Sequence, residues 1–346
     1  MENKITSPSP PGQGQIQIIQ IIRLFASLCV LIYHSSMVGQ HGYFAVEIFN
    51  IISGFVIMYS TRKPDSSNCF FRKRLIRIIP LYWLSSLAMY VLITILPSLS
   101  VMSEATPEYL LKSLFFIPFS NSKGYNTPIL GLGWTLNYEI LFYVIFFLAL
   151  HLSHKYRGLI TSLVLIFFVL SGQLWNRNNN FYWEYYSNLY LLEFVFGIIT
   201  FYIFTWIQKK KIVIHDMILK GITLCSLFWM LFNVGISQNI HRSFCLGIPA
   251  ALFFLSCLLC FENTTFPSFT VKLGNASYSI YLIEYFTTAL FKVIAAGWAL
   301  PLQILGLVAT ILLTLALSLV SYELIEYRFT AFLKRCFCSS AKYNFP

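Results

Sequence analysis

The chain has 346 residues, of which 57% are hydrophobic and only 11% are charged, and its formal net charge is +11. Soluble domains carry about 25% charged residues, so this composition excludes a soluble enzyme and indicates a polytopic membrane protein. Basic residues gather at the inner ends of membrane helices, so the positive charge needs no nucleic acid to explain it.

Ten apolar segments approach or exceed the length of about 20 residues that spans a bilayer. In chain order they are 16–37, 43–60, 79–97, 129–150, 159–174, 188–207, 213–232, 244–261, 273–296 and 300–322. The apolar stretch Tyr109–Phe119 is too short to span and is predicted to be interfacial or re-entrant. The sequence therefore predicts an all-α membrane helix bundle of about ten transmembrane helices.

The spans divide the chain into three parts. They are a mobile cytoplasmic N-terminus (1–15), a transmembrane domain (16–325) and a basic cytoplasmic tail (326–346). With the N-terminus inside, most Lys and Arg residues fall on the cytoplasmic side, and Arg242 is among the few placed outside. By the positive-inside rule, both termini are expected in the cytoplasm.

The first span holds Arg23 and His34, eleven residues apart. This spacing is about three helical turns, so both side chains are predicted to lie on one face, about 16 Å apart along the axis. An ionisable group in the hydrocarbon costs about 2.5–3.5 kcal/mol. The pair therefore marks a substrate path, a proton relay or a catalytic site.

The next two spans add charges at matching depths. Glu47 begins the second span on the outer side, near the expected depth of His34. Arg74 and Arg77 lead into the third span and share one helix face. Beside Arg23, their guanidinium groups suit a phosphorylated ligand from the cytoplasm. The alternative is that these arginines only mark the inner end of a span, as Arg72 and Lys73 are expected to do.

Three later spans also carry polar groups. Glu139, close to Trp134 and Thr135, is either a structural partner of an arginine or a part of the site. Glu193 lies near its helix end and is predicted to snorkel to the interface. Glu284 is deeper in the ninth span and harder to explain as structural. These groups predict a polar tunnel with a cationic inner mouth and a His–carboxylate centre further out.

In this order the motifs resemble those of the bacterial acyltransferase-3 family of integral membrane acyltransferases, most closely its exopolysaccharide O-acetyltransferase branch. Arg23 and His34 match the family's arginine–ten residues–histidine signature. Further matches are Ala45–Phe55, Arg74–Trp83, Gly133–Glu139 with Phe142 and Tyr143, and Leu273–Leu282. Three positions depart from the pattern: Glu47 replaces Asp, Asn50 replaces Phe, and Glu284 replaces His.

The resemblance implies an enzyme of the bacterial inner membrane that moves an acetyl group from cytoplasmic acetyl-CoA to a hydroxyl of an envelope or lipid-linked glycan. His34 would act as a general base or carry the acyl group briefly, and both routes stay open. Glu47 is the expected partner of His34. The residues expected in catalysis are His34, Glu47 and Glu139. Those expected to bind the donor are Arg23, Arg74 and Arg77. Those expected to line or support the substrate site are Ser53, Trp134, Thr135, Tyr143, Ser277, Ser279 and Glu284.

No metal and no permanently bound cofactor is expected, and acetyl-CoA is the expected acyl donor. The other expected partners are a glycan or glycolipid acceptor, membrane lipids and glycan-assembly proteins. Two alternatives stay open. One is a proton-coupled transporter of an envelope precursor, which discontinuous helices or internal repeats would favour. The other is a non-catalytic partner in envelope polysaccharide synthesis. The acceptor and the acyl chain length are not readable from the sequence.

Overall fold

The computed structural model describes residues 16–37, 42–63, 67–97, 103–174, 180–232 and 242–338, and within these ranges the chain is helical and contains no β-strand. The predicted all-α class is therefore confirmed. The predicted mobile segment 1–15 and the end of the predicted tail, 339–346, lie outside the described residues.

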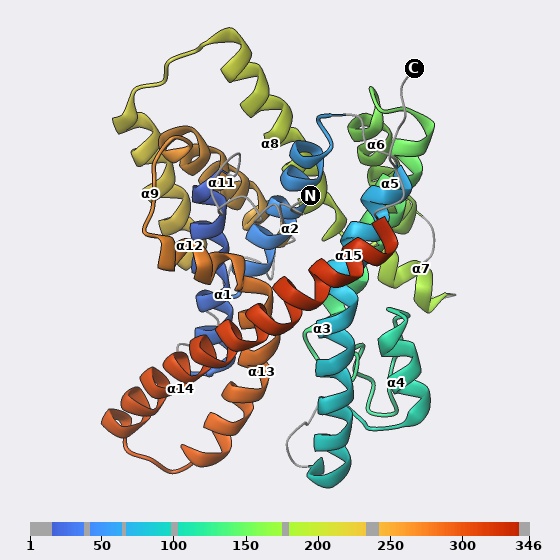
Figure 1. Ribbon diagram of the computed structural model, residues 1–346, viewed down its shortest axis with the longest axis vertical. Helices are drawn as coiled ribbons and strands as arrows, with labels where there is room; N and C mark the ends of the chain where they lie inside the picture. The colour runs from blue at the N-terminus through green and yellow to red at the C-terminus, as the bar shows by residue number, and fades with distance from the viewer. Residues whose placement is uncertain are drawn as a thin grey trace, which may run out of the picture.

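Figure 1 shows how the helices are arranged along the chain. Their bounds are α1 Gln17–His34, α2 Ala45–Ser60, α3 Ser67–Ile95, α4 Pro107–Leu114, α5 Gly133–Leu152, α6 Arg157–Leu174, α7 Phe181–Tyr186, α8 Leu191–Lys210, α9 Asp216–Phe232, α10 Arg242–Cys245, α11 Gly247–Phe261, α12 Ser268–Asn275, α13 Ser277–Ile294, α14 Leu300–Ser321, the π-helix η4 Tyr322–Phe329 and α15 Thr330–Cys338.

Within the described ranges, seven helical segments are long and apolar enough to cross a membrane. They are Gln17–His34, Ser67–Ile95, Gly133–Leu152, Arg157–Leu174, Phe181–Lys210, Arg242–Phe261 and Leu300–Phe337. The helix α2 is apolar but shorter, and α9 and α13 occupy two further predicted spans. The total of ten spans and the cytoplasmic placement of both termini stay predictions.

The inner core forms where α1 packs against α2, α11, α12 and α13, while α2 also packs along α8. Two glycines allow this last contact. A Cβ added to Gly54 would collide with the Phe194 carbonyl, and one added to Gly197 would collide with the Ile51 carbonyl. Close backbone approach of this kind is how membrane helices gain packing energy without a hydrophobic driving force. The close contact with α8 fixes the position of α2, the helix that carries Glu47 and Ser53.

Two predicted span boundaries differ from the structure. The third span was expected at 79–97, but α3 begins at Ser67 and continues through Pro80. Arg74 and Arg77 therefore belong to the same rigid helix as the span. The last span was expected to end at 322, but α14, η4 and α15 form one helical segment, Leu300–Phe337, which crosses in front of α3 in Figure 1.

The predicted span 273–296 is interrupted at Ala276, where α12 gives way to α13. Two backbone hydrogen bonds bridge the break, Ala276 N–H to the Lys272 carbonyl at 3.0 Å and Ile280 N–H to the Ala276 carbonyl at 2.9 Å. Gly274 lies just before it, where a Cβ would collide with the Gln20 carbonyl of α1. The break therefore sets the start of α13 directly against α1.

Candidate active site

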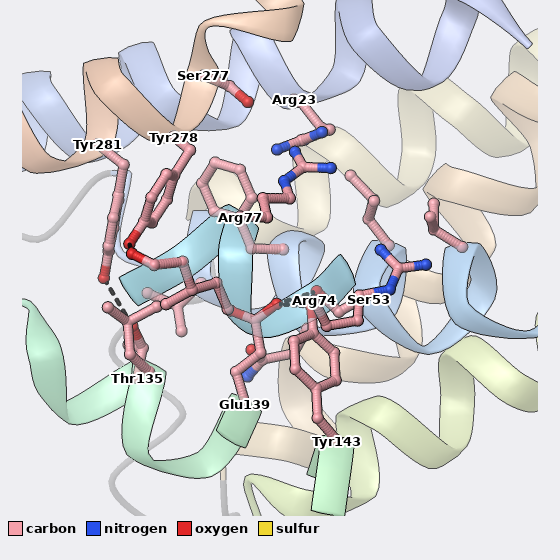
Figure 2. A pocket seen from close by; sticks show the side chains of 17 residues that line it. Arg23, Ser53, Arg74, Arg77, Thr135, Glu139, Tyr143, Ser277, Tyr278 and Tyr281 are labelled. Atoms are coloured by element: carbon pink, nitrogen blue, oxygen red, sulfur yellow. Dashed lines mark hydrogen bonds between the residues drawn. The ribbon is translucent and has the colours of Figure 1, made fainter. Parts of the chain in front are cut away.

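A cavity of about 90 Å³ lies among α1, α2, α3, α5 and α13, and we call it the arginine cavity. The helices bring together the guanidinium groups of Arg23, Arg74 and Arg77, which lie far apart in the sequence (Figure 2). The other polar side chains in its lining are Asn50, Ser53, Thr135, Glu139, Tyr143, Ser277, Tyr278 and Tyr281. Three cationic groups and a single carboxylate line the cavity, so its charge suits an anionic ligand.

Glu139 is the carboxylate of the arginine cavity. It accepts hydrogen bonds from the Tyr143 hydroxyl and from Ser53 Oγ, the latter at 3.2 Å. Arg74 donates to Ser60 Oγ at 2.6 Å, and its guanidinium carbon lies 5.9 Å from the centre of the Tyr143 ring. Glu139 therefore joins α5 to α2 at the cavity wall and faces the arginines. Both roles that the sequence left open for Glu139 stay predictions.

A larger cavity of about 590 Å³ contains His34, and we call it the tyrosine cavity. Its remaining titratable residues other than tyrosine are Glu184 and Lys292. Its aromatic lining consists of Tyr33, Tyr43, Tyr125, Trp134, Tyr138, Phe181, Tyr185, Tyr190, Tyr281 and Tyr285. The imidazole thus lies on a polar and aromatic cavity inside the bundle.

Val46 and Tyr281 line both cavities, so their side chains form the partition between them. The Tyr281 hydroxyl lies 2.8 Å from Thr135 Oγ1 and donates to the Leu132 carbonyl at 3.3 Å. The Tyr281 ring packs edge-on against Phe49, with 5.8 Å between ring centres. The arginines and His34 therefore line two adjoining cavities that are separated by these side chains.

The partner of His34 is Glu284. His34 Nδ1 and Glu284 Oε1 lie 2.8 Å apart, and Glu284 is fully buried while 24% of the His34 side chain is exposed. A carboxylate that accepts the Nδ1 proton favours the tautomer in which Nε2 is free to act as a base. The sequence left the role of Glu284 in doubt because it stands where the family usually has His, and the structure places it in contact with His34.

The expected contact between Glu47 and His34 is wrong. Glu47 is fully buried and forms an ion pair with Arg242 Nε. Arg242 Nη2 also donates to the Tyr43 carbonyl at 3.2 Å, and its guanidinium carbon lies 3.4 Å from the centre of the Tyr43 ring. Arg242 was predicted to lie in an outer loop, yet α10 carries it into the bundle. The sequence contained one sign that Glu47 has such a partner. A glutamate within an apolar segment needs a cationic or hydrogen-bonding partner when it is buried.

Glu193 does not snorkel, as the sequence had suggested. It is fully buried and accepts hydrogen bonds from Asn50 Nδ2 and Ser243 Oγ, each at 2.8 Å. Gly54 of α2 closely approaches the carbonyl of Phe194, the residue after Glu193, so α2 covers this part of α8. Asn50, which replaces the usual Phe of the family motif, supplies one of the two donors.

The two predicted serines of α13 have different surroundings. Ser277 lines the arginine cavity, whereas Ser279 hydrogen-bonds to Glu326 through its backbone N–H at 2.9 Å and through its hydroxyl at 2.5 Å. Glu326 was assigned to the cytoplasmic tail, but η4 returns it to the bundle beside the start of α13. Sequence reasoning missed Glu326 because nothing local distinguishes it from the other charges of the tail.

The acyltransferase-3 family, described as an acyltransferase domain, matches residues 16–323. The chain belongs to this family. It is similar to the exopolysaccharide production protein ExoZ of Rhizobium meliloti, with 29% identity over 79% of this chain and 85% of that protein. It is also similar to the acyltransferase MdmB of Streptomyces mycarofaciens, with 31% identity over 42% of each chain. No solved structure matches the chain.

Family membership decides between the enzyme and the transporter. The interruption at Ala276 is the kind of discontinuity that would favour a transporter, but the family match covers nearly the whole chain. The protein is therefore a multi-pass membrane acyltransferase that uses an acyl donor.

Proposed function

We propose that the protein transfers an acetyl group from cytoplasmic acetyl-CoA to a hydroxyl of an envelope or lipid-linked glycan at the bacterial inner membrane. One observation carries this proposal: a cationic cavity and a cavity with a paired imidazole adjoin at Val46 and Tyr281. The similarity to ExoZ, an exopolysaccharide production protein, supports a polysaccharide acceptor.

The donor's phosphates bind in the arginine cavity. Arg23, Arg74 and Arg77 come from two different helices, so they surround an anion rather than line one surface. The thioester arm then passes Val46 and Tyr281 to reach His34. Arg23 and His34 lie eleven residues apart on α1, a rise of about 16 Å, so a long flexible arm is needed to join them.

The chemistry takes place at His34 Nε2. This nitrogen accepts the proton of the acceptor hydroxyl as the oxygen attacks the thioester carbonyl carbon, and the carbon–sulfur bond then breaks. The coenzyme A thiolate leaves and takes the proton from the imidazolium. Glu284 stabilises the imidazolium while it exists, as the Asp of a Ser-His-Asp triad does. In the alternative route, His34 Nε2 attacks the thioester carbonyl carbon first, and the carbon–sulfur bond breaks to release the coenzyme A thiolate. The acceptor oxygen then attacks the acetyl group, the bond from its carbonyl carbon to Nε2 breaks, and the thiolate takes the hydroxyl proton.

The acceptor binds in the tyrosine cavity. Tyrosine rings present an apolar face and a hydroxyl at the edge, which suits the mixed apolar and hydroxylated surface of a sugar. Cavities that bind small molecules usually measure about 300–1,000 Å³, and the volume of about 590 Å³ lies within this range. The side chains of Tyr33 and Tyr285 pack around the imidazole, with ring centres 5.1 and 6.0 Å away.

The proposal is tested by glycan mass spectrometry on cells that lack the gene. We expect the loss of an increment of about 42 Da per modified residue, the mass that one acetyl group adds. The wild-type gene should restore the increment, and a His34→Ala gene should not. Unchanged acetylation of every envelope glycan in the deleted strain contradicts the proposed function.

Replacing Arg77 tests the donor site. Arg77→Ala should weaken acetyl-CoA binding by about 10–100-fold, because hydrogen bonds to charged groups contribute about 1.5–3 kcal/mol. The difference from wild type should shrink as salt is added, since salt screens charges. The measurement is acetyl-CoA affinity in purified protein. Arg72→Ala is the matched control, since Arg72 is exposed and donates to the Phe337 carbonyl. Equal affinity in all three proteins would leave Arg77 with a purely topological role.

Glu284→Gln tests the His34 partner. The amide keeps the size of the side chain but removes the charge that stabilises an imidazolium. We expect kcat to fall by about 10²–10⁴-fold, by analogy with Asp→Asn in a catalytic triad, with the acetyl-CoA KM nearly unchanged. Glu184→Gln is the control, since Glu184 lines the same cavity without bonding to His34. A Glu284→Gln enzyme with normal kcat would restrict Glu284 to a packing role.

A further inference from the structure

The hydroxyl of Ser277 has no partner. The residue is fully buried and lines the arginine cavity, yet its Oγ makes no hydrogen bond to any residue that the structure describes. Burying a hydroxyl without a partner costs about 1–3 kcal/mol. A polar atom held in this state on a cavity wall indicates that a ligand supplies the missing bond.

Ser277 is also the first residue of α13. This helix has 18 residues, and its N-cap residue, Ala276, has no side chain that could accept a hydrogen bond from the first turn. The N-terminus of a helix carries a partial positive charge and free N–H donors, which together favour anions. Figure 2 shows Ser277 on the same side of the cavity as Arg23, with Arg77 below them.

The carboxylate of Glu326 accepts hydrogen bonds from the first turn of α13. Glu326 accepts the Ser279 N–H at 2.9 Å and the Ser279 hydroxyl at 2.5 Å, and it interacts electrostatically with Arg77 and Arg23. The first turn of α13 therefore already binds one carboxylate through Ser279. Ser277 lines the arginine cavity, and its hydroxyl is not used by this carboxylate.

We propose that Ser277 and the first turn of α13 bind one phosphate group of the donor, together with the guanidinium groups of Arg23 and Arg77. This inference rests on the proposed function and adds a binding element that is not an arginine. The ligand class is a phosphate ester of a nucleotide. The 3′-phosphate and the diphosphate of coenzyme A share this chemistry, and the experiment distinguishes them.

The test compares the affinities of purified full-length wild-type, Ser277→Ala and Ser318→Ala proteins for acetyl-CoA and for its 3′-dephospho form. Ser318 is the matched control because its hydroxyl is also fully buried without a partner among the described residues, but it lies outside the arginine cavity. Ser277→Ala should weaken acetyl-CoA binding about 10-fold, as expected for a lost hydrogen bond to a charged group. Ser318→Ala should bind within twofold of wild type.

The dephosphorylated donor identifies the phosphate. If Ser277 binds the 3′-phosphate, Ser277→Ala and wild type bind the dephospho form equally. If it binds the diphosphate, the 10-fold loss persists with that form. Both results support the subsite. Wild-type affinity of Ser277→Ala for both donors overturns it.

Melting temperature separates a lost ligand contact from a damaged fold. Without donor, Ser277→Ala should melt no lower than wild type, because the change removes a buried hydroxyl that has no partner. Saturating acetyl-CoA should then stabilise the variant less than wild type. A lower melting temperature without donor, with an unchanged donor-induced shift, contradicts the subsite.

The inference and the proposed function can fail separately. Weaker acetyl-CoA binding in Arg77→Ala together with unchanged binding in Ser277→Ala removes the α13 subsite and leaves the proposed donor site intact. Unchanged binding in both variants removes both.

Discussion

Replacing His34 with Ala should lower kcat for acetyl transfer by about 10²–10⁴-fold, which is what a positioned general base contributes. The imidazole lies on the tyrosine cavity, and its Nδ1 is held by Glu284 at 2.8 Å. Among the residues that the structure describes, no other histidine lines either cavity. Acetyl-CoA affinity should stay within a few-fold of wild type, because the arginines that bind the donor are unchanged. The measurement is steady-state acetyl transfer with purified protein.

His34→Ala also leaves the Glu284 carboxylate buried without its partner, which by itself destabilises the site. His34→Asn is therefore the matched variant, since its amide N–H can still donate to Glu284 but cannot act as a base. Both variants should insert into the membrane and bind donor, and both should lose activity. Wild-type turnover in His34→Asn would remove the imidazole from the mechanism.

The same enzyme distinguishes the two chemical routes. If His34 carries the acetyl group, mixing enzyme with acetyl-CoA alone releases about one equivalent of coenzyme A per protein before any acceptor is added. If the hydroxyl attacks directly, release of coenzyme A requires the acceptor. His34→Asn should show no release in either case.

Breaking the ion pair between Glu47 and Arg242 should cost about 3–5 kcal/mol in the free energy of unfolding. Both residues are buried, so Arg242→Met leaves the Glu47 carboxylate without its countercharge. Glu47 has a second buried oxygen, Oε2, and it has no hydrogen-bond partner among the described residues that could compensate. The variant should melt well below wild type in detergent.

A double variant separates the ion pair from general damage to packing. Glu47→Leu with Arg242→Met removes both charges and should recover most of the lost stability, because a well-packed apolar pair replaces a buried ion pair at little cost. Glu108→Ala is the control for a surface pair. Lys112 and Glu108 are 2.5 Å apart but Glu108 is 68% exposed, so this change should cost less than about 1 kcal/mol. If Arg242→Met is as stable as wild type, the pair is not structural.

Local spacing predicted the features that lie within a single helix. Arg23 and His34 share α1, and Arg74 and Arg77 share α3, because a helix fixes the relative direction of residues a few turns apart. Their predicted convergence in one polar region agrees with the structure, where the arginines line one cavity and His34 lines the adjoining one.

Pairing between helices was not predictable in the same way. The sequence predicted Glu47 as the partner of His34, but α1 packs against both α2 and α13, and the structure pairs His34 with Glu284. Which carboxylate meets the imidazole depends on how far each helix is rotated about its axis. That rotation is set by distant contacts, such as the close approach of Gly54 to α8 and of Gly274 to α1. The depth of a residue in the membrane, which the sequence predicts, does not reveal the rotation of its helix.

By itself, the sequence determined that this protein is a helical membrane protein, which residues are ionisable within its apolar segments, and which family motifs it carries. These follow from composition and from spacing within one helix. Only the tertiary structure decided that Glu284 holds His34, that Arg242 neutralises Glu47, and that Glu326 returns to the start of α13. Each of these contacts joins segments more than 40 residues apart, and the packing of the whole bundle selects among partners that are chemically equivalent.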